Sequence, residues 1–281
     1  MSQTPDVQSL KALARELRLE VLDVTTQVAS GHVSSSYSSV EILVAVYFGG
    51  ILRYRPQEPH WPERDRFILS KGHSAIGLYA TLALRGYFLV EELRTFDAID
   101  SRLQGHPDMT VTPGVDMSTG SLGQGLSPGV GMAIGAKMRG LAFRTWVMLG
   151  DGEVQEGQVW EAAEVAARYR LDNLTAIVDN NRLPQYTWPD FGHRGREHPV
   201  ANLPAKWSAF GWRVFECDGH DMDAIVRTLE AAGGVEGQPA AVIAHTIKGK
   251  GVSFMEGEFA WHAKPLDAEG LARALAELEA S

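Results

Sequence analysis

Hydrophobic residues recur along this chain with two alternating spacings, one typical of helices and one typical of buried strands. Residues 8–29 predict an amphipathic helix, because one stripe of this segment carries Leu10, Leu13, Leu17, Val21 and Val24. Continuous apolar runs at 145–149 and 174–178 predict buried strands, and residues 156–170 between them have helical spacing. Two more strands of the same sheet are expected at 213–217 and 240–245. This alternation predicts an α/β fold with a mostly parallel sheet flanked by helices on both faces.

The remaining segments continue this alternation without an evident linker. Further helices are expected at 39–48, 74–85, 126–139, 222–232 and about 267–279. We therefore expect a single domain over residues 1–281 rather than two. Residues 184–198 are rich in Pro, Gly, His and aromatic residues, which predicts a long loop inside this domain, and loops of that length are often functional.

Composition narrows the classes of function. Hydrophobic residues make up 44% and charged residues 22% of the chain, as in ordinary globular proteins. The net charge of -9, with no basic run, disfavours binding to nucleic acid. The polar start of the chain lacks a secretory signal pattern, and no apolar stretch reaches membrane-spanning length. We therefore expect a cytoplasmic protein that contacts neither nucleic acid nor membrane.

Asp151 and Asn181 are the strongest candidates for chemistry. Asp151 follows the strand at 145–149 within Gly-Asp-Gly, and Asn181 closes Asp-Asn-Asn after the strand at 174–178. The carboxyl ends of parallel strands meet at one edge of a sheet, where ligands bind. Each tripeptide alone would be interpreted as a tight turn. Their joint placement instead favours a site for Mg²⁺ and a diphosphate.

The oxygen ligands at this edge suit magnesium. Mg²⁺ prefers six oxygens in octahedral geometry and usually shares phosphate oxygens with its ligand. Asp151 and Asn181 supply two side-chain oxygens, and the backbone carbonyl of Leu183 could supply a third. Gly150 and Gly152 would let a phosphate approach the backbone closely.

The stretch from Gly150 to Asn181 resembles the thiamine diphosphate fingerprint, and the whole chain resembles the amino-terminal half of transketolase. The other segments that carry the resemblance are Ser30-Gly31-His32, DRFILSKGH at 65–73, QGHPD at 104–108, STGSLGQG at 118–125 and TIKGKGVSFMEGEFAWH at 246–262. They occur in the order of the family. The resemblance implies a diphosphate-binding domain that holds thiamine diphosphate and Mg²⁺, with Ca²⁺ or Mn²⁺ as substitutes for the metal.

The resemblance also implies roles for residues of the loops. His73, Gly152, Asn181 and His262 would contact the cofactor, together with Gly120, Ser121 and Leu122 of the glycine-rich turn. His32, His106 and His262 would hydrogen-bond the donor ketose, since imidazole both donates and accepts protons near neutral pH. The other histidines are expected to be structural or exposed: His60, His193, His198, His220 and His245.

Glu156 and Glu161 lie five positions apart on the expected helix 156–170. Exposed carboxylates on a helix are the usual explanation for such residues. In the family, however, glutamates at these positions lie at the subunit interface near the cofactor and take part in its proton chemistry. Both interpretations stay open.

The implied activity is transfer of a two-carbon ketol unit from a ketose, or a ketose phosphate, to an aldose. The pyrimidine-binding and C-terminal domains of the family would then belong to a second, separately encoded subunit, in an α2β2 assembly. Val33, Ser34 and Ser35 follow His32 where Pro and Gly are frequent in the family, which leaves the identity of the sugar open. Two alternatives are the alpha subunit of a thiamine-dependent 2-oxo acid dehydrogenase and a non-catalytic scaffold subunit.

Overall fold

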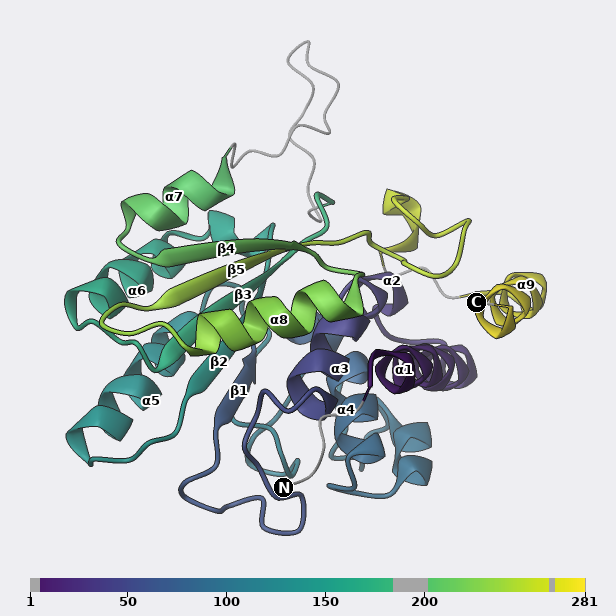
Figure 1. Ribbon diagram of the computed structural model, residues 1–281. Helices are drawn as coiled ribbons and strands as arrows, with labels where there is room; N and C mark the ends of the chain where they lie inside the picture. The colour runs from purple at the N-terminus through teal and green to yellow at the C-terminus, as the bar shows by residue number, and fades with distance from the viewer. Residues whose placement is uncertain (1–5, 184–201, 263–265, 281) are drawn as a thin grey trace.

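The computed structural model describes residues 6–183, 202–262 and 266–280, and its centre is a parallel sheet (Figure 1). The order of the five strands is β1-β2-β3-β5-β4, and all four neighbouring pairs are parallel. The strands are β1 (Arg66–Leu69), β2 (Thr145–Gly150), β3 (Leu174–Asn180), β4 (Arg213–Asp218) and β5 (Ala240–His245). The four predicted strands are thus confirmed. β1 was not predicted as a strand.

Helices cover both faces of this sheet, as predicted (Figure 1). One face packs against α3, α4 and α8, with α1 behind them, and the other face packs against α5, α6 and α7. The helices are α1 (Val7–Val28), α2 (Val33–Tyr37), α3 (Val40–Phe48), α4 (Ala75–Leu84), α5 (Leu126–Met138), α6 (Gly157–Arg168), α7 (Leu203–Ala209), α8 (Met222–Gly233) and α9 (Ala268–Glu279). Short 3₁₀ turns occur at Gly72–Ser74, Val90–Thr95, Glu153–Gln155 and Phe259–Trp261.

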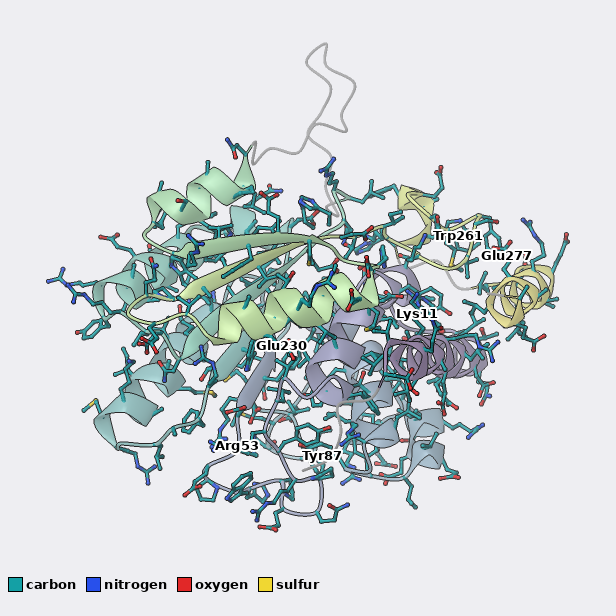
Figure 2. All side chains as sticks on the ribbon, viewed as in Figure 1. Lys11, Arg53, Tyr87, Glu230, Trp261 and Glu277 are labelled. Carbon is teal, nitrogen blue, oxygen red and sulfur yellow. The ribbon has the colours of Figure 1, made fainter. Side chains whose placement is uncertain are left out.

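The continuous apolar runs exist because both faces of each inner strand are buried. Trp146 and Met148 of β2 belong to the apolar cluster under α1, α3 and α8, whereas Val147 and Leu149 belong to the cluster under α5 and α6. Successive residues of a strand point to opposite faces, so a doubly covered strand needs an apolar residue at every position. Surface helices bury one stripe only, and Lys11 and Glu230 lie on the exposed sides of α1 and α8 (Figure 2).

The first helix ends close to its expected end at residue 29, because α1 ends at Val28 with Ala29 in the left-handed region, and His32 is the residue before α2. The loop expected at 184–198, with His193 and His198, lies outside the described residues. In the part of the chain that the structure describes, none of the helices combines the length and the apolar character needed to cross a bilayer.

Candidate functional site

The carboxyl ends of β2 and β3 open into a cleft of about 170 Å³. Asp151 follows the last residue of β2, and Asn181 follows the last residue of β3. The sheet register pairs Gly150 with Asp179, so the two polar segments lie side by side. Eight of the predicted residues line this cleft: His73, Leu122, Asp151, Gly152, Glu156, Asn181, Leu183 and His262.

Backbone hydrogen bonds fix the side chains of the predicted metal ligands. The carboxylate of Asp151, a residue only 3% exposed, accepts from the Gly152 N–H at 2.7 Å and from the Arg182 N–H. Oδ1 of Asn181 accepts from the Leu183 N–H at 3.1 Å. The turn at 181–183 is thereby tied to both strand ends, and a carboxylate, an amide oxygen and a backbone carbonyl reach one cleft.

Three imidazoles gather at the cleft: His73 and His262 line it, and His32 packs against both without lining it. The ring centroids of His32 and His73 lie 5.3 Å apart, those of His32 and His262 lie 5.2 Å apart, and those of His73 and His262 lie 5.9 Å apart. Ser34 donates from Oγ to the carbonyl of Trp261 at 2.8 Å, which holds the turn before His262 against α2. Trp261 is labelled in Figure 2, where its turn lies beside α2. Three segments that are far apart in sequence thus supply one histidine cluster.

This cluster is electrically neutral near pH 7. Burial and the nearby Lys71 ammonium lower the pKa of His73 to about 2. Burial and Lys248 lower the pKa of His262 to about 4, and burial and His106 lower the pKa of His32 below its ordinary value. A neutral imidazole can accept a proton at one nitrogen and donate at the other. The cluster can therefore both donate and accept hydrogen bonds toward a bound polar ligand.

Lys248 was not predicted as a site residue. It is 2% exposed, lines the cleft, donates from Nζ to the Leu183 carbonyl at 3.1 Å and lies 2.5 Å from Nδ1 of His262. Burial and the neighbouring Lys71 lower its pKa to about 8. This ammonium supplies positive charge between the predicted metal ligands and the histidines, where an anionic ligand needs it.

Lys71 and Asp179 form a buried ion pair beneath the cleft, which sequence reasoning also missed. The two side chains are 1% and 0% exposed. Asp179 also accepts from the hydroxyls of Ser38, at 2.6 Å, and Thr246, while Lys71 donates to the Ser35 carbonyl at 2.9 Å. Both lysines occur within motif segments and directly before a glycine, in an acidic chain. That placement was the signal that could have identified them.

The glycine-rich turn is pressed against the loop of His73. A side chain at Gly72 would place its Cβ 2.7 Å from the Gly120 nitrogen, and a side chain at Gly120 would place its Cβ 2.7 Å from the His106 ring. Gly120 also has a φ of 151°, which favours glycine. The turn therefore brings Leu122 to the cleft. His106, beside this turn, and Ser121, within it, are exposed, and neither of them nor Gly120 lines the cleft.

Glu156 and Glu161 differ in their relation to the cleft. Both are exposed in this chain. Glu156 precedes α6 and lines the cleft, whereas Glu161 lies one turn further along the helix and does not. The structure thus brings one of the two carboxylates to the candidate site. Ordinary surface glutamates and glutamates of a subunit interface would both be exposed in the isolated chain, so the exposure does not distinguish these two interpretations.

The residues present suit a magnesium ion that is shared with a ligand. Within residues 6–183, 202–262 and 266–280, no group of three or more His, Cys, Asp or Glu side chains could hold a metal unaided. The cleft instead offers one carboxylate, one amide oxygen and one backbone carbonyl, all hard oxygen donors. Mg²⁺ bound this way needs further oxygens, such as those of a diphosphate.

Comparison with known proteins shows to which family the chain is similar. Residues 9–279 match the family model described as "Transketolase, thiamine diphosphate binding domain". The chain is similar to the 6-deoxy-6-sulfo-D-fructose transketolase subunit SqwG of Clostridium sp., with 44% identity over 99% of this chain and 98% of the relative. It is also similar to one of the subunits of the apulose-4-phosphate transketolase of Phocaeicola vulgatus, with 39% identity over 91% of this chain and 89% of that relative.

Longer transketolases match over part of their length. Human transketolase is 40% identical over 93% of this chain, which spans 41% of that relative. The crystal structure of transketolase from Campylobacter jejuni superposes with a TM-score of 0.89 and 31% identity, over 98% of this chain and 43% of the other.

Proposed function

Given that this chain belongs to the transketolase family as a thiamine diphosphate binding domain, we propose that it is the cofactor-anchoring subunit of a two-chain transketolase. The reaction is transfer of a two-carbon ketol unit from a ketose, or a ketose phosphate, to an aldose. The observation that carries this proposal is the single cleft that contains Asp151, Asn181 and Leu183 on one side and His73 and His262 on the other.

Asp151, Asn181 and Leu183 would hold Mg²⁺ through a carboxylate, an amide oxygen and a carbonyl. Ca²⁺ and Mn²⁺ also accept oxygen ligands and would substitute for it. Gly152 would allow the diphosphate close to the backbone, with Lys248 contributing positive charge. Gly120, Ser121 and Leu122 would contact the rings of thiamine diphosphate.

Thiamine diphosphate, when bound, supplies the carbanion and the electron sink that cleavage beside a ketose carbonyl requires. The chain's own residues bind and orient the sugar around that chemistry. His32 and His262 are neutral and meet edge to face with ring centroids 5.2 Å apart, so they can hydrogen-bond the hydroxyl and carbonyl oxygens of a donor ketose. His106, which lies at the exposed edge beside Gly120, would contact the sugar from the entrance.

The proposed partner is a second subunit that carries the pyrimidine-binding and C-terminal domains, in an α2β2 assembly. One observation supports it. The relatives named as subunits are matched over 98%, 89% and 95% of their length, while human transketolase is matched over 41%. In that assembly the partner would bury Glu156, which lines the cleft, and Glu161, which lies further along α6, and would couple them to the proton chemistry of the cofactor.

The substrate is expected among ketoses with an anionic or polar tail. The relatives are named for 6-deoxy-6-sulfo-D-fructose and for apulose 4-phosphate, so these two sugars and xylulose 5-phosphate form the first screen. The family match favours this reaction over oxidative decarboxylation of a 2-oxo acid. A parallel assay with 2-oxo acids tests that alternative directly.

The test compares this chain alone, its partner alone and the two together, each with thiamine diphosphate and Mg²⁺. We expect ketol transfer only from the mixture. Full turnover by this chain alone would refute the requirement for a partner. Failure of the mixture to bind thiamine diphosphate would refute the enzymatic role and favour the scaffold alternative.

A further inference from the structure

We propose that Arg18, Glu41 and His220 form a buried clamp that holds segment 246–250 in place and thereby positions Lys248 in the cleft. None of the three residues lines the cleft. They are positioning residues rather than catalytic ones. The inference rests on the proposed function only in assigning Lys248 a role toward an anionic ligand.

The clamp is built from three separate elements. Arg18 lies on α1, Glu41 on α3, and His220 lies just before α8. Nη2 of Arg18 lies 2.7 and 2.8 Å from the two carboxylate oxygens of Glu41, and their side chains are 7% and 10% exposed. Nδ1 of His220 lies 3.0 Å from Oε2 of Glu41, and the His220 side chain is also 10% exposed. One buried carboxylate thus joins a guanidinium and an imidazole.

Arg18 and His220, at the two ends of this network, both hydrogen-bond the backbone of segment 246–250. The Ile247 N–H donates to Nε2 of His220 at 2.8 Å, and Nε of Arg18 donates to the Lys250 carbonyl at 2.9 Å. The side chain of Lys248, between these two points, extends into the cleft. The Gly249 N–H donates to the Ser34 carbonyl at 2.9 Å, which adds a contact from α2. The segment is therefore held by its backbone on both sides of the one residue that it presents to the cleft.

The hydrogen bonds also assign the tautomer of His220. Because Nε2 accepts from the Ile247 N–H, the proton of the neutral ring lies on Nδ1 and is donated to Glu41. Burial alone would raise the pKa of Glu41, but the Arg18 guanidinium and the His220 hydrogen bond lower it below its ordinary value. Glu41 is thus an anion that orients the Arg18 guanidinium and the His220 imidazole. The oriented imidazole then accepts the hydrogen bond from the backbone N–H of Ile247.

The position of Lys248 matters because its ammonium connects two parts of the site. It lies 2.5 Å from Nδ1 of His262 and donates to the carbonyl of Leu183. A shift of segment 246–250 would move this charge relative to both the histidine cluster and the predicted metal ligands. The clamp therefore connects α1 and α3, outside the cleft, to the charge inside it.

Two substitutions at residue 220 distinguish the role of the donor at Nδ1 from that of the acceptor at Nε2. His220→Asn retains a donor near the position of Nδ1 and removes the acceptor for the Ile247 N–H. His220→Gln can place its carbonyl oxygen near the position of Nε2 and keeps that acceptor. His60→Asn, at an exposed histidine of the described residues, is the matched control.

Hydrogen exchange of the full chain without cofactor provides the test. For His220→Asn we expect the peptide covering 246–251 to exchange roughly fivefold faster, the factor that corresponds to one lost hydrogen bond, with residues 240–245 of β5 unchanged. His220→Gln and His60→Asn should match the unsubstituted chain. Equal effects of Asn and Gln at residue 220, or faster exchange throughout β5 and α8, would overturn the clamp.

A second measurement needs no variant. In the unsubstituted chain, the Ile247 amide should exchange as slowly as the amides of β5, and exchange at the rate of an open loop would contradict the clamp. With partner and thiamine diphosphate added, His220→Asn should raise the KM for the cofactor several-fold, with His220→Gln restoring it. Because the exchange experiments contain no cofactor, their outcome stands even if the proposed activity fails.

Discussion

The ion pair between Lys71 and Asp179 gives the sharpest test of the structure beneath the cleft. Asp179→Asn retains the shape of the side chain and one acceptor oxygen but removes the negative charge. Lys71, which is 1% exposed, would then keep a buried ammonium without its anionic partner. The second carboxylate oxygen, which serves the hydroxyls of Ser38 or Thr246, would also be lost as an acceptor.

The expected cost is large because both partners are fully buried. Removing one member of a buried ion pair typically costs about 3–5 kcal/mol, whereas an exposed pair is worth about 1 kcal/mol or less. Burial would raise the pKa of Asp179, but the Lys71 ammonium and its hydrogen bonds lower it below the ordinary 3.8. The stabilisation is therefore present above pH 3.8 and is lost as the pH falls through the lowered folded-state pKa.

Urea unfolding of the full chain at pH 7.5 measures this cost. The matched control is Asp172→Asn, since Lys137 and Asp172 form an ion pair of 2.6 Å with side chains 42% and 31% exposed. We expect Asp179→Asn to lower the free energy of unfolding by about 3 kcal/mol or more and the control by about 1 kcal/mol or less. Equal losses in the two variants would refute the buried pair, and Lys71→Met added to Asp179→Asn should recover part of the loss.

Two further predictions follow from pKa values and from close packing. Because the folded-state pKa values of His73 and His262 lie near 2 and 4, the unfolded chain binds more protons below pH 6.5, so stability should fall as the pH drops from 6.5 toward 4. Each histidine contributes a slope of up to about 1.4 kcal/mol per pH unit; His73→Gln should flatten the slope in urea titrations, and an unchanged slope would contradict the neutral buried ring. Gly120→Ala should lower the thermal midpoint, because its Cβ would lie 2.7 Å from the His106 ring at a φ of 151°, whereas Gly131→Ala meets no atom within 4 Å. Equal midpoints for the two alanine variants would show that the turn is not pressed against His106.

The fold was predictable where apolar periodicity is long. The strands β2 to β5 and the long helices were all predicted to within a few residues. β1 was missed because the strand is only four residues long, Arg66–Leu69. The polar residues on both sides of it hide its short apolar pattern. α2 was missed because three of its five residues are serines, and its burial beneath neighbouring elements, rather than its sequence, stabilises it.

The site was predictable where ligands follow directly from strand ends. Asp151 and Asn181 come after apolar runs, so the sequence places them at one edge of the sheet. The sequence did not indicate Lys71, Asp179 or Lys248, because the importance of each depends on burial and on a partner far away in the chain. Lys71 pairs with Asp179 and Lys248 contacts Leu183, and in both cases the two residues are more than 60 positions apart. A local pattern does not contain such pairings. The clamp on segment 246–250 was missed for the same reason, since α1, α3 and the start of α8 meet only in the folded chain.

The central claim is that Asp151 anchors a metal that in turn holds thiamine diphosphate. The most direct measurement is calorimetric titration of thiamine diphosphate into the chain together with its partner, with Mg²⁺ and with a chelator. We expect binding that requires the metal and that Asp151→Ala abolishes, while His60→Asn binds as the unsubstituted chain does. Unchanged affinity in Asp151→Ala, or equal affinity with and without metal, would show that Asp151 does not anchor the cofactor through a metal.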